Sequence, residues 1–202
     1  MRTQIIGLIQ DVLPKYDNVK EGGHGKDHII DVIEKSYNMA IEFNENPEVC
    51  CVAALFHDIG LLTNSRAVHH IASAIYVIEH AKFLKRYFKE DEIYKIYSAV
   101  LEHRSGYNGE YTSMISKIVS DADRSTNIYK MISRSYAYNK SKGYDEDKIY
   151  NEVYGHLKEK YYERRYKFLS SELQKELDDA REILKNEEEF KRYYKEITSS
   201  CK

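Results

Sequence analysis

The chain of 202 residues is poor in the residues that form tight turns, with two prolines and nine glycines. β-Sandwiches and β-barrels consist of many short strands joined by turns, and proline and glycine supply most of those turns. Lysine, glutamate, tyrosine and isoleucine are frequent instead, while tryptophan is missing. The composition therefore argues against an all-β fold and predicts an all-α protein with long helices.

Cysteine is scarce as well. Cys50 and Cys51 are adjacent, and Cys201 stands near the C-terminus. Neighbouring residues of a helix point about 100° apart, so the first two cysteines cannot easily form a disulfide with each other. An odd number of cysteines without a spacing pattern predicts reduced thiols and a cytoplasmic protein.

A strong charge of one sign and long apolar runs are also lacking. The formal net charge is −2, which gives no reason to expect a nucleic acid or a membrane surface as a partner. No window reaches the ~18 consecutive apolar residues of a membrane span. The N-terminal segment lacks the apolar stretch and cleavage site of a signal peptide. The sequence is typical of a globular protein with a well-charged surface.

Apolar residues recur at spacings of three and four along most of the chain, which indicates amphipathic helices. We predict helices over residues 3–13, 26–43, 47–58, 66–88, 90–103 and 112–136, with charged helices after residue 145. Loops that contain glycine are expected over residues 16–25 and 104–111. This organisation predicts a core domain over residues 1–140. A helical extension over residues 141–202 should pack on that core, and its charged end should fray.

Three side chains that can bind a metal fall on the inward rows of two of these helices. Continuing the apolar stripe of the 26–43 helix back by four residues from Val32 reaches His28. The apolar 47–58 helix ends in the adjacent pair His57 and Asp58, each on a row of buried residues. An apolar helix that ends in two strong ligands suggests that both are used.

A carboxylate from the 112–136 helix can complete the set. Asp123 continues the apolar row of Ile115 and Val119, whereas Asp121 lies on a more mixed row. We therefore expect Asp123 as the fourth ligand and keep Asp121 as the alternative. Imidazole nitrogen together with carboxylate oxygen suits a divalent ion such as Mn²⁺, Fe²⁺, Co²⁺, Ni²⁺, Zn²⁺ or Mg²⁺.

The order of one His, a His-Asp pair and a distant Asp resembles the HD-domain superfamily of metal-dependent phosphohydrolases. The local sequences agree with it: HGKDH, whose second histidine is the ligand, AALFHDIG and SDADR. The resemblance covers roughly residues 20–130 and implies an HD-domain helical bundle with further C-terminal helices. It assigns the metal ligands to His28, His57, Asp58 and Asp123.

Shorter stretches of the sequence also resemble the HD-domain superfamily. His69 in HHIASA and His103 in VLEHRSG resemble histidines that bind a second ion in two-metal members and line the pocket in one-metal members. The resemblance implies catalytic roles for these two, for Asp58 and for Arg104, which could neutralise charge on a phosphate. It also implies substrate contacts, which we assign to Lys26, Arg124 and Asn127.

The function implied is hydrolysis of a phosphate ester by a metal-activated water, with a small nucleotide or related phosphometabolite as substrate. A second ion and a homodimer are left open. The chain departs from close bacterial families where it has Ile30-Asp31-Val32 in place of Arg-Val and Ser125-Thr126 in place of Leu-Asp. Three alternatives follow: a catalytically silent nucleotide-binding module, a metal-free scaffold, and a di-iron oxygenase in which His69 and His103 both bind iron.

Overall fold

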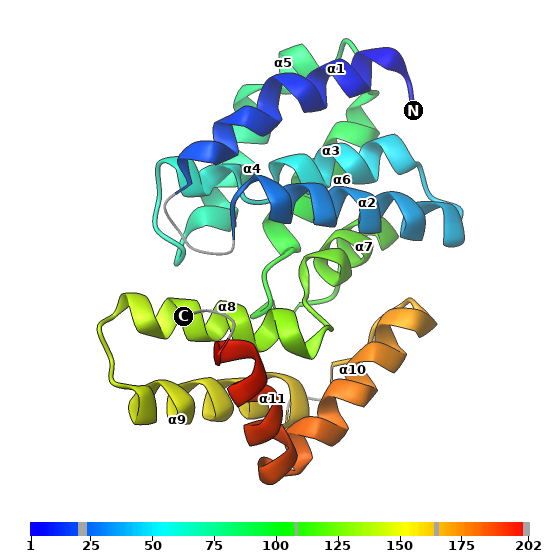
Figure 1. Ribbon diagram of the computed structural model, residues 1–202. Coiled ribbons are helices and arrows are strands. Elements are labelled where there is room, and N and C mark those ends of the chain that lie inside the picture. Colours follow the sequence, from blue (N-terminus) through cyan, green and yellow to red (C-terminus); the bar gives the residue numbers. More distant parts are fainter. Residues whose placement is uncertain (20–23, 108, 164–165, 200–202) are drawn as a thin grey trace. The chain divides into compact units, whose positions relative to one another are not determined.

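The computed structural model describes residues 1–19, 24–107, 109–163 and 166–199, and every regular element in these ranges is a helix (Figure 1). The all-α prediction is therefore confirmed. The chain divides into two compact units, Met1–Arg124 and Ser125–Lys202. The expected boundary at residue 140 lies close to the end of the first helix of the second unit.

The first unit consists of seven α-helices and two short 3₁₀-helices among its described residues. In chain order they are α1 (Thr3–Val12), η1 (Leu13–Asn18), α2 (Lys26–Glu42), α3 (Pro47–Phe56), η2 (Ile59–Leu62), α4 (His69–Glu79), α5 (Ala81–Leu84), α6 (Glu90–Glu102) and α7 (Met114–Asp123). Part of the loop expected over residues 16–25 is thus the helix η1. Gly22 and Gly23 lie outside the described residues.

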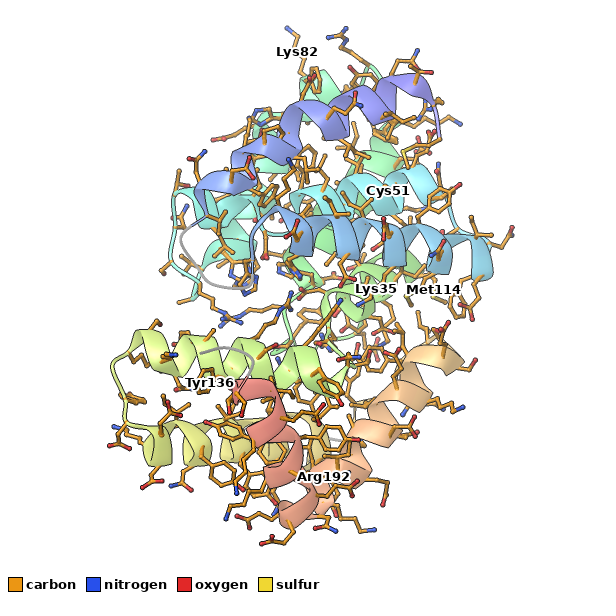
Figure 2. The ribbon with its side chains drawn as sticks, in the orientation of Figure 1. Lys35, Cys51, Lys82, Met114, Tyr136 and Arg192 are labelled. Carbon is orange, nitrogen blue, oxygen red and sulfur yellow. The ribbon has the colours of Figure 1, made fainter. Side chains whose placement is uncertain are left out.

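Helix α3 is the centre of this unit and contacts α1, α2, α6 and α7. All residues from 49 to 56 are buried, because an apolar helix without a polar face has to be covered on every side. The side-chain oxygen of Asn46 accepts the amide of Glu48 and begins the helix, with Pro47 in the first turn. Figure 2 marks Cys51 on this helix.

Two of the expected helices are interrupted, so those predictions were wrong. The helix expected over residues 66–88 breaks at His80, between α4 and α5. The helix expected over residues 112–136 ends at Asp123, because Arg124 has an extended backbone, and Asn127 begins the next helix. Apolar periodicity continues across such breaks, since both segments bury one face. The second break leaves Asp123 at the end of a helix.

The second unit contains α8 (Ile128–Ser141), α9 (Glu146–Leu157), a π-helical turn η3 (Lys158–Glu163), α10 (Ser171–Lys185) and α11 (Glu187–Ser199). Helix α8 packs on α9 and α11, and α10 packs on α11 (Figure 1). Phe190, Tyr194 and Ile197 of α11 are buried. Helix α11 thus runs to Ser199 with one apolar face covered, and the expected fraying of the charged end stays a prediction. Among the described residues, no helix combines the length and apolarity needed to cross a membrane.

Candidate metal centre

Histidine and aspartate side chains meet where five helices of the first unit begin or end. His28 lies in the first turn of α2, and His69 is the first residue of α4. His57 and Asp58 follow the end of α3. The two remaining members are His103, directly after α6, and Asp123, the last residue of α7. Helix ends free the backbone to turn, so short side chains from several helices can converge on one point.

His28, His57 and Asp123 form the first group. The Nε2 atoms of the two histidines are 3.3 Å apart. The Oδ1 atom of Asp123 lies 3.1 Å from Nε2 of His28 and 3.6 Å from Nε2 of His57. Both histidines are buried, whereas the Asp123 side chain is 18% exposed. Three donor atoms thus surround one small volume, as ligands of a single ion do.

Asp58 stands between this group and a second one. Its Oδ2 atom lies 3.2 Å from Nε2 of His57 and 3.7 Å from Nε2 of His28. Its Oδ1 atom lies 3.2 Å from Nε2 of His69 and 3.6 Å from Nε2 of His103. One carboxylate therefore offers one oxygen to each pair of histidines, and its side chain is 1% exposed.

Three of these imidazoles are held in one tautomer by the backbone. His57, His69 and His103 each donate from Nδ1 to the carbonyl three residues earlier, at 2.6, 2.7 and 2.6 Å, on Ala54, Arg66 and Val100. A carbonyl only accepts, so Nδ1 carries a proton in each ring, and Nε2 is the nitrogen that faces the centre and can bind an ion. Metal-binding histidines are typically oriented in this way.

The pair His69 and His103 could hold a cation between its ring nitrogens. Their Nε2 atoms are 3.1 Å apart, and both rings use their Nδ1 proton on a carbonyl. Two lone pairs at this distance repel each other unless a proton or a metal ion lies between them. The nitrogen and carboxylate donors of the whole cluster fit a divalent ion of the borderline or hard class.

The carboxylates and imidazoles of the cluster shift each other's pKa values. Burial alone would raise the pKa of Asp58, but His57 and hydrogen bonds from His103 and His24 hold this pKa well below its usual value. Burial would lower the pKa of His57, yet Asp58 and Asp123 raise it well above the usual value. Burial is the main cause that lowers the pKa of His28. Burial would also raise the pKa of Asp123, but hydrogen bonds from His28 and His57 hold it well below its usual value, so both carboxylates stay charged and attract a cation.

Asp121, the alternative fourth ligand, is arranged differently. Its side chain is fully buried, and Oδ1 accepts from Nζ of Lys117 at 2.5 Å, one turn earlier in α7. Asp123, in contrast, directs its carboxylate toward His28. The geometry favours Asp123, and its role as a ligand stays a proposal.

The sequence reasoning missed His24. Its Nδ1 atom lies 2.7 Å from Oδ2 of Asp58, and its ring packs edge-on against that of His28. The apolar period starts inside α2 and so gives no information about a residue that precedes the N-cap, Gly25. The only signal was the first histidine of HGKDH, four residues before His28.

The two arginines expected to contact phosphate differ in exposure. Arg104 is exposed and donates to the carbonyl of Ala67 at 2.9 Å. Arg124 is buried and donates to Oγ of Ser120 at 3.1 Å, and that hydroxyl in turn donates to the carbonyl of His103.

The two other expected substrate contacts lie at helix starts. Lys26 is the first residue of α2 and is half-buried. Asn127 belongs to the second unit, where its side-chain oxygen accepts the amide of Lys130 and caps α8. The expected contact of Asn127 with a base or ribose stays a prediction.

Comparisons with known proteins identify the fold and the family. A crystal structure of a predicted HD superfamily hydrolase from an uncultured Thermotogales bacterium has a TM-score of 0.56 at 19% identity, over 96% of this chain and 91% of that one. The crystal structure of Bacillus subtilis YpgQ in complex with ADP has a TM-score of 0.64 at 15% identity, over 96% of each chain. No curated protein matches the sequence. The HD domain family model matches residues 25–128, about half of the chain, and the protein therefore belongs to the HD-domain family.

Proposed function

We propose that the protein is a metal-dependent phosphohydrolase that acts on a phosphate ester of a small nucleotide or related phosphometabolite. The observation that carries the proposal is the position of Asp58 between two pairs of imidazoles whose Nε2 atoms face its carboxylate. The HD-domain family and the predicted HD hydrolase among its structural neighbours support it.

In this proposal the first ion would be held by His57 and His28, whose Nε2 atoms each lie near a carboxylate oxygen of Asp58 and of Asp123. A divalent ion bound there would polarise a phosphoryl oxygen and lower the pKa of a bound water. Asp58 has a second oxygen on the side of His69 and can accept a proton from, or orient, a water beside it. The backbone carbonyls that hold the histidine rings keep the donor atoms in place without substrate.

Positive and hydrogen-bonding groups for the phosphate come from residues next to the cluster. His69 and His103 supply imidazole nitrogens, and Arg104 is exposed directly after His103. Arg124, which is bonded to Ser120 behind the carbonyl of His103, is a weaker candidate for a direct phosphate contact. Neutralisation of the phosphate charge would stabilise the transition state.

The nucleotide class rests on the neighbour YpgQ, which was crystallised with ADP and has the same fold. Nucleoside diphosphates and triphosphates are accordingly the first compounds to test. The base and sugar that this chain prefers depend on residues that differ among proteins of one fold.

A two-ion form is a second candidate, because Oδ1 of Asp58 with His69 and His103 makes a second group of three possible ligands. A second ion held there would accept the lone pairs of both imidazoles and so remove the repulsion between them. Two equivalents of iron together with turnover that depends on oxygen would instead indicate a di-iron oxygenase.

The test combines metal analysis of the purified protein with a panel of nucleotides and other phosphoesters. Asp58→Asn should lose bound metal and hydrolysis together. The control is Asp178→Asn, which removes a charge from an exposed aspartate of α10 and should change neither. Tight nucleotide binding without turnover by the metal-loaded protein would favour a silent module. A protein without affinity for divalent ions would be a scaffold.

A further inference from the structure

Tyr16 is a buried tyrosine on η1, outside the residues that the HD family model matches. Its side chain is 1% exposed, and a buried hydroxyl destabilises a fold unless it is hydrogen-bonded. This hydroxyl donates to the backbone carbonyl of Leu55, with an oxygen–oxygen distance of 2.5 Å. The bond joins segments that are 39 residues apart in the chain.

The carbonyl of Leu55 belongs to the last turn of α3, directly before the ligand pair. The last four carbonyls of a helix have no partner within that helix. Here a side chain takes each of two consecutive ones: Nδ1 of His57 donates to Ala54, and Tyr16 donates to Leu55. Two consecutive carbonyls at the end of α3 are therefore each bonded by a side chain, directly before His57 and Asp58.

The segment that carries Tyr16 also contacts other parts of the centre. Helix η1 packs on α2, which carries His28, and on η2, which follows Asp58. Pro14 in its first turn restricts the backbone of η1. Burial and the nearby charge of Asp58 raise the pKa of Tyr16 well above its usual value, so the hydroxyl keeps its proton and stays a donor.

We propose that Tyr16 is a positioning residue of the metal centre, which holds the last turn of α3 so that His57 and Asp58 keep their directions. The inference rests on the proposed function, because it assumes that these two side chains bind an ion. Tyr16 acts through the backbone of α3 and not by touching the ion. Without its hydroxyl the last turn can relax, and the donor atoms of His57 and Asp58 then fit the ion less well.

The test compares Tyr16→Phe with Tyr136→Phe. Tyr136 is also buried, at 2% exposure, and its hydroxyl donates to Oε1 of Glu146 at 3.1 Å within the second unit. Each variant keeps the ring and removes one tyrosine hydroxyl. The measurements are the affinity for Co²⁺ in competition with a chromophoric chelator, the visible absorption spectrum of the bound Co²⁺, and the Tm without metal.

Both variants should lower the Tm of the metal-free protein. Only Tyr16→Phe should weaken Co²⁺ binding, by ~10-fold or more, and shift the Co²⁺ spectrum, because that spectrum reports ligand geometry. All binding is measured at a temperature where the circular dichroism of both variants equals that of the unchanged protein.

Two results would overturn the inference. If Tyr16→Phe binds Co²⁺ as tightly as Tyr136→Phe and with the same spectrum, Tyr16 has a structural role only, and the proposed metal site stands. If the unchanged protein binds no divalent ion, the proposed function fails and the inference fails with it.

Discussion

The amide of Gly60 donates a hydrogen bond to Oγ of Ser73, with a nitrogen–oxygen distance of 2.8 Å. This bond fastens the turn after Asp58 to α4, the helix that begins with His69. A Cβ atom at position 60 would lie 2.3 Å from the carbonyl oxygen of His69 and 2.8 Å from the amide nitrogen of Ser73. Only glycine allows the two backbones to approach so closely.

Gly60→Ala should therefore separate Asp58 from His69. Both clashing atoms belong to the backbone of α4, so the strain cannot be relieved by a side-chain rotation. We expect a loss of ~1–3 kcal/mol in the free energy of unfolding, measured with urea. The matched control is Gly155→Ala in α9, where a Cβ would meet no atom within 4 Å. That substitution should be neutral or stabilising, since alanine favours a helix. Equal stability of the two variants would contradict the close-packing argument.

Asp123→Asn and Asp121→Asn should differ in metal affinity. The first removes a carboxylate that faces His28 and should weaken Mn²⁺ binding by at least ~10-fold, measured by isothermal titration calorimetry. The second breaks the ion pair with Lys117 and should lower the Tm while Mn²⁺ still binds. The opposite pattern would make Asp121 the fourth ligand.

Metal binding should release a proton and strengthen as the pH rises. Because the pKa of His57 in the folded, metal-free protein lies above its ordinary value, Nε2 of His57 holds a proton that the ion must displace. That proton stabilises the metal-free fold below the ordinary pKa of histidine, and the contribution is lost as the pH rises through the folded pKa.

Calorimetry in buffers of different ionisation enthalpy measures the release directly. We expect about one proton per ion near neutral pH, and a smaller number at higher pH. No release anywhere between about pH 6 and pH 8 would show that His57 is already neutral in the metal-free protein.

The two cysteines of α3 should be unreactive in the folded protein. Burial, followed by the charge of Glu48, raises the pKa of Cys51 to about 12, and burial also raises that of Cys50. Thiolate is the reactive form, so both thiols are protected by protonation and by lack of access. In a Cys201→Ser background, which removes the cysteine outside the described residues, a disulfide reagent at pH 8 should label neither. Unfolding in urea should expose both, and rapid labelling of the folded protein would contradict this placement.

Much of the candidate site could be predicted, because it follows from the order of the residues in the chain and from the apolar period of single helices. His57 and Asp58 end a helix that is apolar on all sides, so the sequence alone shows that both project from a buried element. The inward row of α2 places His28 on its buried side, and these placements need only the period of one helix. The row through Val119 favoured Asp123 as the more inward carboxylate, but Asp121 is the more buried of the two, so the period of α7 alone does not choose the ligand.

The helix breaks at His80 and Arg124 could not be predicted in the same way. Apolar residues continue at helical spacing on both sides of each break, and no proline marks either position. The break at Arg124 is supported by Asn127, whose side chain caps the next helix. Asparagine occurs at many positions, so a cap alone does not identify a boundary.

The sequence by itself thus determined the helical class, the buried helix that leads to His57 and Asp58, and the HD pattern. Only the tertiary structure decided that His24 reaches Asp58, that Asp58 stands between two pairs of histidines, and that Tyr16 donates to the carbonyl of Leu55. The physical reason is that periodicity shows which side of one helix faces inward. Which inward residues of different helices meet depends on how the helix ends pack, and that depends on the whole core.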